Sequence, residues 1–399
     1  MRSYRHLFRT PEFTPLFLAS CANVAAQTVG GLALATLVYR ATGSPLLSAV
    51  SMFGPSLAQV AGASLFLSGA DRLPPRAALT GLALAFTATT AFLAVPGLPI
   101  WALFAVLLAQ GLVASLGGGV RWGLLNEILA KDGYLLGRSL FNMMSGVMQI
   151  AGYATGGVLV ALLSPRLCLL LAAALYALSA ATTRFGLSRR APRAVGRPSV
   201  AATWRTNALL WSSRPRRTVY LALWLPNGLV VGCESLYVSY APQAAGALFA
   251  CAALGMLAGD VTVGRLVPPA PRRRLGVPLL WLLAAPYLLF FLRPAVPVAA
   301  AAVALASVGF GASLVQQERL MELTPDELSG HALGLHSAGM LTLQGVSAAL
   351  AGSVAQLTSP PTAMTVMAGA SLVVTACLAP GLRAGGGQEK GAGARMANQ

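Results

Sequence analysis

Charged side chains are scarce in this 399-residue chain: Asp, Glu, Lys and Arg make up 10% of it, and only 11 residues are acidic. An average soluble protein carries about 25% of such residues. Apolar residues reach 56%, and the mean hydropathy is +0.70. A chain with so little polar surface cannot cover a soluble globule of this size. The composition therefore excludes a soluble protein and indicates a membrane protein with many spans.

Cysteine and histidine are also rare. The five cysteines lie in apolar runs without CxxC spacing, and two of the three histidines, His331 and His336, are five residues apart. That spacing does not suit two ligands on one helical face. The glycines at 117–119 lack the Gly-Lys-Ser/Thr continuation of a phosphate-binding loop. We therefore expect no disulfide framework, no metal, no cofactor and no enzyme activity.

The positive charge that is present is unevenly distributed. The segment 183–219 contains nine arginines and no acidic residue, and when loops are assigned by alternation only Arg40, Arg166 and Arg293 lie on the opposite side of the membrane. Positive residues are retained on the cytosolic side of a membrane. The pattern predicts a multi-pass protein of the cell (cytoplasmic) membrane with both termini in the cytosol. The net charge of +17 then needs no nucleic-acid partner.

Two halves of the chain resemble each other at a constant offset of 193 residues. This offset relates Gly62 to Gly255 and Arg72 to Arg265, and it also pairs Gly118 with Gly311, Gly137 with Gly330, Gly146 with Gly339 and Gly152 with Gly345. Self-similarity of this kind indicates an internal repeat. Apolar runs predict membrane helices at about 14–39, 45–69, 77–95, 100–120, 136–163, 167–186, 217–240, 245–264, 276–293, 295–316, 331–357 and 362–379.

These runs predict an all-α membrane protein with twelve transmembrane helices in two six-helix halves. We expect a first half at 1–187, a basic cytosolic linker at 188–216, a second half at 217–380 and a disordered tail at 381–399. Within the linker, Val200, Trp204, Ala208 and Trp211 recur at helical spacing. This pattern fits an amphipathic helix on the inner leaflet, facing anionic lipid, and fits equally a spacer packed under the bundle.

Three stretches carry a resemblance to a known family: LVYRATGSPL at 37–46, the turn at Asp71 and Arg72, and RWGLLNEILAKDGYLLGRSLFN at 121–142, which recurs as ERLMELTPDELSGHALGLHS at 318–337. Together they resemble the major facilitator superfamily, and within it the group of macrolide efflux pumps and the enterobactin exporter. The resemblance implies a monomeric secondary transporter that moves a small-molecule substrate by alternating access between two six-helix halves.

The inner-turn motif of that superfamily is matched by Asp71, Arg72 and Arg76, whereas Leu67 and Pro74–Pro75 depart from it. The resemblance implies a conformational gate formed by these residues and Arg265. Asp71 would lie beside the helix that begins near 329, whose N-terminus favours an anion. The alternative is that Asp71 is only a turn residue.

Two further motifs are matched in part. Gly152, Gly156 and Gly157 match the glycines of the antiporter motif, with Tyr153 in the place of its proline. Gln110 matches the fourth-helix motif of proton-coupled members, but Leu107 occupies the place of its arginine. We expect the glycines to allow close helix packing. The resemblance favours export, and the departure at Leu107 sets the chain apart from the usual proton-coupling arrangement.

Two carboxylates fall within apolar runs, Glu234 and Asp260. A charge at mid-membrane costs about 2.5–3.5 kcal/mol on insertion scales, so each needs a reason to be there. Glu234 follows Pro226–Gly228, a predicted break in its helix, and is the first candidate for proton coupling. The alternatives are a structural hydrogen bond for Glu234 and an ion pair with Arg265, or a cap, for Asp260. Cavity-lining candidates are Asn23, Gln27, Gln110, Asn142, Gln149, Asn227 and Gln344, although any of these side chains would also serve to bridge helices.

The sequence as a whole predicts proton-driven export of an amphipathic small molecule, such as a drug, an antibiotic or a siderophore. Two other functions stay open: uptake of a nutrient by the same fold, and a transport-inactive membrane sensor or scaffold. The departures at Leu107, Tyr153 and Pro74–Pro75 argue for the last of these.

Overall fold

A computed structural model describes residues 4–65, 73–129, 131–192, 200–325 and 328–384. Within these ranges every regular element is a helix, and twelve helical segments are long and apolar enough to cross a membrane. This confirms the predicted twelve-helix fold. Asp71, Arg72 and the last fifteen residues of the predicted tail lie outside the described residues.

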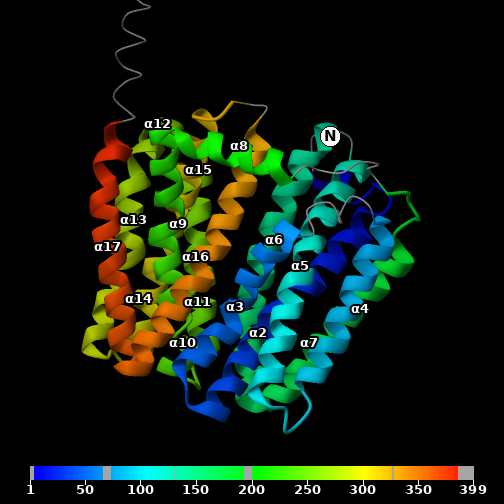
Figure 1. Cartoon of the computed structure of the whole chain (residues 1–399), viewed down its shortest axis with the longest axis horizontal. Helices are drawn as coiled ribbons and strands as arrows, with labels where there is room; N and C mark the ends of the chain where they lie inside the picture. The colour runs from blue at the N-terminus through cyan, green and yellow to red at the C-terminus, as the bar shows by residue number, and fades with distance from the viewer. Residues whose placement is uncertain (1–3, 66–72, 130, 193–199, 326–327, 385–399) are drawn as a thin grey trace, which may run out of the picture. The chain divides into compact units, whose positions relative to one another are not determined.

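The chain divides into two compact units (Figure 1). Unit 1 comprises Met1–Pro198 and Tyr237–Ala250, and unit 2 comprises Ser199–Leu236 and Cys251–Gln399. The segment Tyr237–Ala250 belongs to the second half by sequence but packs within unit 1.

Unit 1 contains α1 (Tyr4–Leu7), α2 (Phe13–Thr42), α3 (Pro45–Leu65), α4 (Pro75–Leu93), α5 (Ile100–Ile128), α6 (Lys131–Leu162), α7 (Pro165–Gly186) and α10 (Tyr237–Tyr240). α2 packs against α3, α6 and α7, while α3 packs on α5 and α4 on α7. Local sequence sets the ends of these helices. Gly43 closes α2 at φ 63°, a left-handed conformation that glycine adopts without steric cost, and the Ser164 side chain caps α7 by accepting from the Leu167 N–H at 3.2 Å.

The fourth span is longer than the sequence predicted. α5 continues to Ile128, well into the predicted polar interval, and only Leu129 leaves the helical conformation. Leu124, Leu125 and Leu129 are buried there in a cluster with Phe13 and Phe141. Burial of these leucines extends the helix because they carry an apolar stripe through an otherwise polar stretch.

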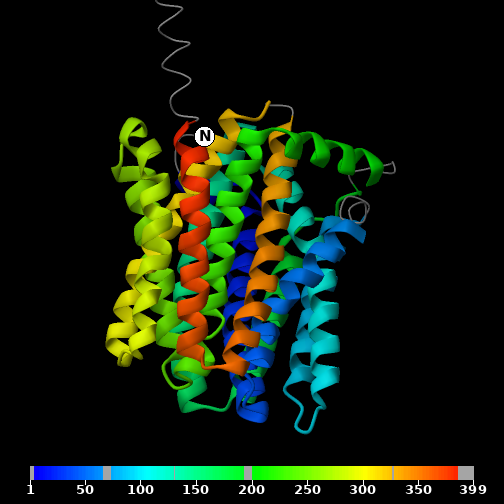
Figure 2. The ribbon, with the colours of Figure 1, turned by 60° about the vertical axis from the view of Figure 1, so that its left-hand side comes forward.

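Unit 2 contains α8 (Val200–Ser212), α9 (Arg214–Glu234), α11 from Cys251 on (the whole helix is Ala245–Val261), η1 (Thr262–Leu266), α12 (Pro269–Arg272), η2 (Arg273–Leu275), α13 (Gly276–Ala284), η3 (Ala285–Leu292), α14 (Val296–Val308), η4 (Gly309–Gly311), α15 (Ala312–Glu322), α16 (Ser329–Leu357) and α17 (Pro360–Ala384). α9 packs against α16, α17, α15 and α13 (Figure 2). The last helix extends beyond the predicted boundary at 380. Leu382 is buried, and its carbonyl accepts a hydrogen bond from Arg319, which holds the end of α17 in place.

The repeat is visible in the packing of both units. α2 contacts α6 and α7 in unit 1, as α9 contacts α16 and α17 in unit 2. Gly62 of α3 lies directly against the backbone carbonyl of Leu112 in α5, and Gly255 of α11 lies against that of Ala304 in α14. In both places a Cβ atom would overlap the carbonyl oxygen. The two glycines, 193 residues apart, therefore make the same close helix crossing.

Candidate functional site

Among the carboxylates that the structure describes, only Glu234 is buried. Its exposed fraction is 7%, and its Oε1 atom has no hydrogen-bond partner. No ion pair reaches it within the described residues. A buried carboxylate without a charge partner is costly, so the protonated, neutral carboxyl is the form that suits this site.

Close packing against two helices holds Glu234 in place at the end of α9. At the preceding residue, the Cys233 Sγ donates to the Met364 carbonyl of α17 at 3.3 Å. One residue earlier, a Cβ on Gly232 would lie 2.9 Å from the Ser347 carbonyl oxygen of α16. These contacts hold the end of α9, which carries Glu234, against α16 and α17.

The predicted break at Pro226–Gly228 is wrong, because α9 is helical from Arg214 to Glu234 with Pro226 inside it. Tertiary packing holds the helix together here. Ser371 of α17 donates its hydroxyl to the Pro226 carbonyl at 3.2 Å, and Gly228 lies against Leu343 of α16. Proline still leaves the Ala222 carbonyl without its usual helical donor.

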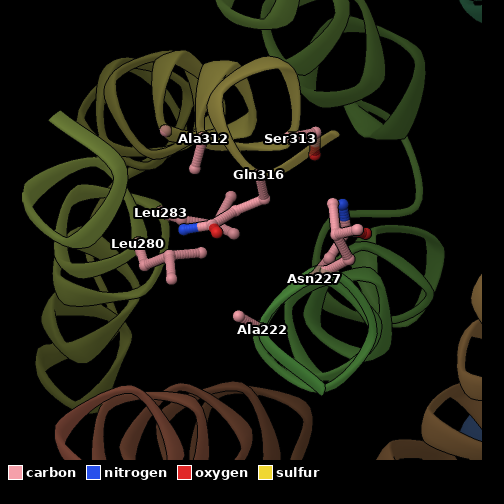
Figure 3. A pocket seen from close by; sticks show the side chains of 9 residues that line it. Ala222, Asn227, Leu280, Leu283, Ala312, Ser313 and Gln316 are labelled. Carbon is pink, nitrogen blue, oxygen red and sulfur yellow. The ribbon is translucent and has the colours of Figure 1, made fainter. Parts of the chain in front are cut away.

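A narrow pocket lies beside this proline, between α9, α13 and α15 of unit 2 (Figure 3). Its lining residues are Ala222, Leu223, Asn227, Leu280, Leu283, Gly309, Ala312, Ser313 and Gln316. Asn227 and Gln316 are its buried polar side chains, with exposed fractions of 5% and 3%. The amide oxygens Asn227 Oδ1 and Gln316 Oε1 both lack a hydrogen-bond partner. The pocket is too narrow to hold a ligand in this structure, so these two buried acceptors are left unsatisfied.

Sequence reasoning found Asn227 but missed Gln316. Asn227 is a lone polar residue in an apolar run, whereas Gln316 precedes Gln317, Glu318 and Arg319 and so looks like the start of a polar segment. The signal that distinguishes it is helical spacing: Val315, Gln316 and Leu320 are buried on one side of α15.

The other cavity candidates lie in different surroundings. Gln110 bridges two helices of unit 1, because its Nε2 donates to Thr89 Oγ1 at 2.6 Å and to Thr90 Oγ1 at 3.2 Å. Gln27 of α2 and Asn142 of α6 are exposed, whereas Asn23, Gln149 and Gln344 are half-buried. Gln110 is therefore a structural link, and a cavity role for the other candidates stays a prediction.

Asp260 and Arg265 do not form the ion pair that was considered for them. Both side chains are exposed, and no salt bridge joins them in the part of the chain that the structure describes. Asp260 is thus a weaker coupling candidate than Glu234.

The gate residues can be placed only in part. Arg76 is half-buried in the first turn of α4, but Asp71 and Arg72 lie outside the described residues. The predicted gate therefore stays a prediction.

The glycines of the antiporter-like motif pack as predicted at two of three positions. A Cβ on Gly152 would overlap the Thr28 side chain of α2, and one on Gly157 would lie 2.6 Å from the Gly246 Cα of α11. Gly156 makes only ordinary contacts. Tyr153, in the place of the motif's proline, stacks on Phe249 with ring centroids 4.8 Å apart. The motif thus joins α6 to α2 and to the first part of α11, within unit 1.

Comparison with known proteins supports the fold but shows no closer relationship. No family profile and no curated protein sequence matches the chain. The structure resembles that of a POT family transporter crystallised with a thioalcohol-conjugated peptide, at 12% identity and a TM-score of 0.73, covering 92% of this chain and 96% of that one.

Two other solved structures are similar. A bacterial homologue of the human lysosomal transporter Spinster is inward-facing and unoccupied, and it aligns at 13% identity and a TM-score of 0.72 over 93% of this chain and 96% of that chain. The nucleoside transporter NupG aligns at 13% identity and a TM-score of 0.70 over 92% and 99%. At these identities the likeness extends to the fold, and the chain has the twelve-helix fold of major facilitator transporters.

Proposed function

We propose that this protein is a secondary active transporter that moves a small molecule across the cell membrane by alternating access. Support comes from the major facilitator fold and from the likeness of the chain, over at least 92% of its length, to three solved transporter structures. No nucleotide-binding motif occurs in the sequence, so an ion gradient is the energy source that this chain can use by itself.

The observation that carries the coupling proposal is the burial of Glu234 without a charge partner. A carboxyl group in such a site is stable when protonated, and its charged form is stabilised only when water or a cation reaches it. If alternating access exposes the site to one side of the membrane and then to the other, the group picks up and releases a proton in each cycle. Glu234 thereby links transport to the proton gradient.

Export of an amphipathic molecule is the direction and substrate class that we propose. The close contacts at Gly152 and Gly157 support the resemblance to the antiporter motif, which favours export. The described membrane spans contain few charged side chains and bury one carboxylate, so an amphipathic substrate suits them better than a strongly ionic one.

A second candidate is uptake of a polar solute. It is favoured by the structural neighbours, whose names describe a peptide-bound transporter and a nucleoside transporter. The amide oxygens of Asn227 and Gln316 are unpaired, and they would accept hydrogen bonds from a substrate with N–H donors if the narrow pocket opened during the cycle. The third possibility, a transport-inactive sensor or scaffold, rests on the motif departures at Leu107 and Tyr153.

Accumulation of a panel of amphipathic compounds and of small peptides and nucleosides, measured in cells with and without the protein, tests the proposal. We expect the wild type to lower the accumulation of at least one amphipathic compound, and both an uncoupler and Glu234→Gln to abolish this effect. Asp260→Asn tests the weaker coupling candidate, and we expect it to leave export intact because that carboxylate is exposed.

Each other outcome selects an alternative. Raised accumulation of a peptide or nucleoside identifies uptake. Export that survives Glu234→Gln but not the uncoupler removes Glu234 from the coupling path. No change with any compound favours the sensor or scaffold.

A further inference from the structure

The helix that precedes the second half, α8, lies crosswise to the membrane-spanning helices of unit 2. Figure 2 shows it projecting sideways from the beginning of α9. α9 spans the membrane, and α8 joins it at Ser213. α8 therefore lies at the level where the membrane core meets water, with its axis along the surface. A short helix with apolar and basic faces is stable in such a place when it rests on lipid.

One end of α8 is fixed to unit 2 by aromatic packing. Trp211 stacks on Trp224 of α9 with ring centroids 5.6 Å apart and planes 9° apart, and it also stacks on Tyr220 at 6.2 Å. Trp224 donates its indole N–H to the His336 carbonyl of α16 at 3.1 Å. Gly339 makes this platform possible, because a Cβ there would overlap the Trp224 ring.

The other part of α8 exposes a large apolar side chain, because Trp204 is 68% exposed. Tryptophan is favoured at the headgroup level of a membrane, because its ring is apolar and its N–H needs a polar partner. The spacer interpretation accounts for Trp211, which packs under the bundle, and leaves Trp204 unexplained.

Exposed arginines lie on α8 and at the start of α9. Arg205, Arg214 and Arg217 are exposed, and no acidic residue occurs between 133 and 233 in the sequence. Arg216 is half-buried and donates to the Leu209 carbonyl at 3.3 Å, which ties the start of α9 to α8. Within the described residues no ion pair reaches the three exposed arginines, which can therefore attract the anionic headgroups of a membrane surface.

We propose that α8 binds the anionic phospholipid surface of the membrane, with Trp204 inserted at the headgroup level and Arg205, Arg214 and Arg217 against lipid phosphates. Trp211 packs on Trp224 of α9, and Trp224 is bonded to α16. Lipid binding by α8 therefore fixes the height of α9 and α16 relative to the membrane surface. This surface is independent of the proposed transport activity.

Quenching of tryptophan fluorescence by brominated lipids tests the proposal. The full-length protein is placed in nanodiscs that contain either brominated phosphatidylglycerol or brominated phosphatidylcholine at equal mole fraction, and the signal of Trp204 is the difference between wild type and Trp204→Ser. We expect phosphatidylglycerol to quench Trp204 at least about twofold more strongly, because arginines concentrate anionic lipid around it.

Two variants and one condition sharpen the test. The preference for phosphatidylglycerol should vanish in the triple variant Arg205→Gln, Arg214→Gln, Arg217→Gln, and at about 0.5 M salt, where charge attraction at a surface is screened. Trp101 is the matched control. It is 75% exposed at the start of α5, so the signal lost in Trp101→Ser should be quenched alike by both lipids.

A Trp204 signal that neither lipid quenches would show that α8 faces water or protein, and would overturn the proposal. Equal quenching by both lipids, unaffected by the triple variant, would show an apolar contact without charge selectivity and would also overturn it. If Trp204→Ser fails to fold, Trp204→Phe gives the same subtraction with the ring retained.

Discussion

The two units share one packing scheme and differ in how regular their helices are. In unit 1 each described membrane span is α-helical throughout, from α2 to α7. In unit 2 the corresponding second, third and fourth spans each contain a stretch that is not α-helical. These stretches are the π-helix η1, the 3-10 helix η3 and the 3-10 helix η4. Such stretches have poorer backbone hydrogen bonding and mark hinges and functional sites more often than ordinary helix does.

The two units also differ in the hydrogen bonding of their buried polar side chains. In the described spans of unit 1, the buried serines and threonines have hydrogen-bond partners, and the unpaired Arg121 Nε belongs to a half-buried residue. In unit 2, unpaired polar atoms occur on fully buried side chains, namely Asn227, Glu234, Ser307, Gln316, His336 and Thr375. Folding alone gains nothing from such groups. From this difference we propose that unit 1 acts as the scaffold and that unit 2 carries the working groups.

The largest losses of stability should come from alanine substitutions at the two glycine crossings that the units share. The losses should be equal in the two units. Gly62→Ala and Gly255→Ala each force a Cβ into a backbone carbonyl, which cannot move aside as a side chain would. We expect each variant to lose more than about 2 kcal/mol of stability. Melting temperatures in detergent measure this, with Gly118→Ala as control because nothing lies near its Cβ position. A tolerated Gly255→Ala would contradict the equivalence of the two crossings.

Gly146 and Gly339, which the repeat also relates, should respond differently to replacement by alanine. A Cβ on Gly339 meets the Trp224 ring, whereas one on Gly146 meets nothing within 4 Å. Gly339→Ala should therefore cost about 1–2 kcal/mol. Gly146→Ala should be neutral or stabilising by up to about 1 kcal/mol, since alanine favours helix over glycine. Thermal unfolding of the two variants decides the matter, and equal effects would show that the units are less different here than their contacts indicate.

Removing a hydrogen-bonded amide and removing an unpaired amide should change the stability of the protein in opposite directions. Gln110→Leu removes a bridge to Thr89 and Thr90 in unit 1 and should cost about 1 kcal/mol. Gln316→Leu removes an unpaired buried amide in unit 2 and should stabilise the protein by about 1 kcal/mol.

The same Gln316→Leu variant should transport less if its pocket serves the cycle. Unfolding and transport are measured on the same preparations, and Ser313→Ala is the control, because Ser313 lines the pocket but its hydroxyl is not an unpaired buried group. A destabilised Gln316→Leu with normal transport would assign the amide to structure.

The smallest effects should come from ion pairs at the helix ends. Arg190 contacts Glu12 at 3.3 Å and Glu127 at 3.2 Å in unit 1, and all three side chains are no more than a third exposed. In unit 2, Arg273 pairs with Glu322 at 2.5 Å, but both side chains are more exposed. Arg190→Gln should cost about 0.5–1 kcal/mol and Arg273→Gln a few tenths at most. Denaturation at low and high salt checks this ranking of the two variants. A larger loss of stability in Arg273→Gln than in Arg190→Gln would show that exposure does not govern the strength of these ion pairs.

The sequence predicted the fold well because hydropathy and repeat spacing express it directly. Each of the twelve spans lies within a few residues of its apolar run, apart from the extensions of α5, α15 and α17, where polar residues hide a buried stripe. The glycine pair at 62 and 255 could be recognised from its offset alone.

The site was less predictable, because its features depend on neighbours that are distant in sequence. Pro226 was expected to break α9, but Ser371, 145 residues later, stabilises the helix there. Tyr153 counted against the antiporter motif, and its stacking partner Phe249 lies in the other half of the chain. Glu234 was found because a carboxylate in an apolar run is rare, yet its lack of a partner is visible only in the structure.

The most direct test of Glu234 as the coupling group compares two assays in proteoliposomes, once a substrate is known from the cellular panel. One assay measures accumulation driven by a pH gradient, and the other measures exchange of labelled for unlabelled substrate without a gradient. We predict that Glu234→Gln, which mimics the protonated carboxyl, loses gradient-driven accumulation and retains exchange. Gradient-driven accumulation at the wild-type rate in Glu234→Gln would contradict the account and return Glu234 to a structural role.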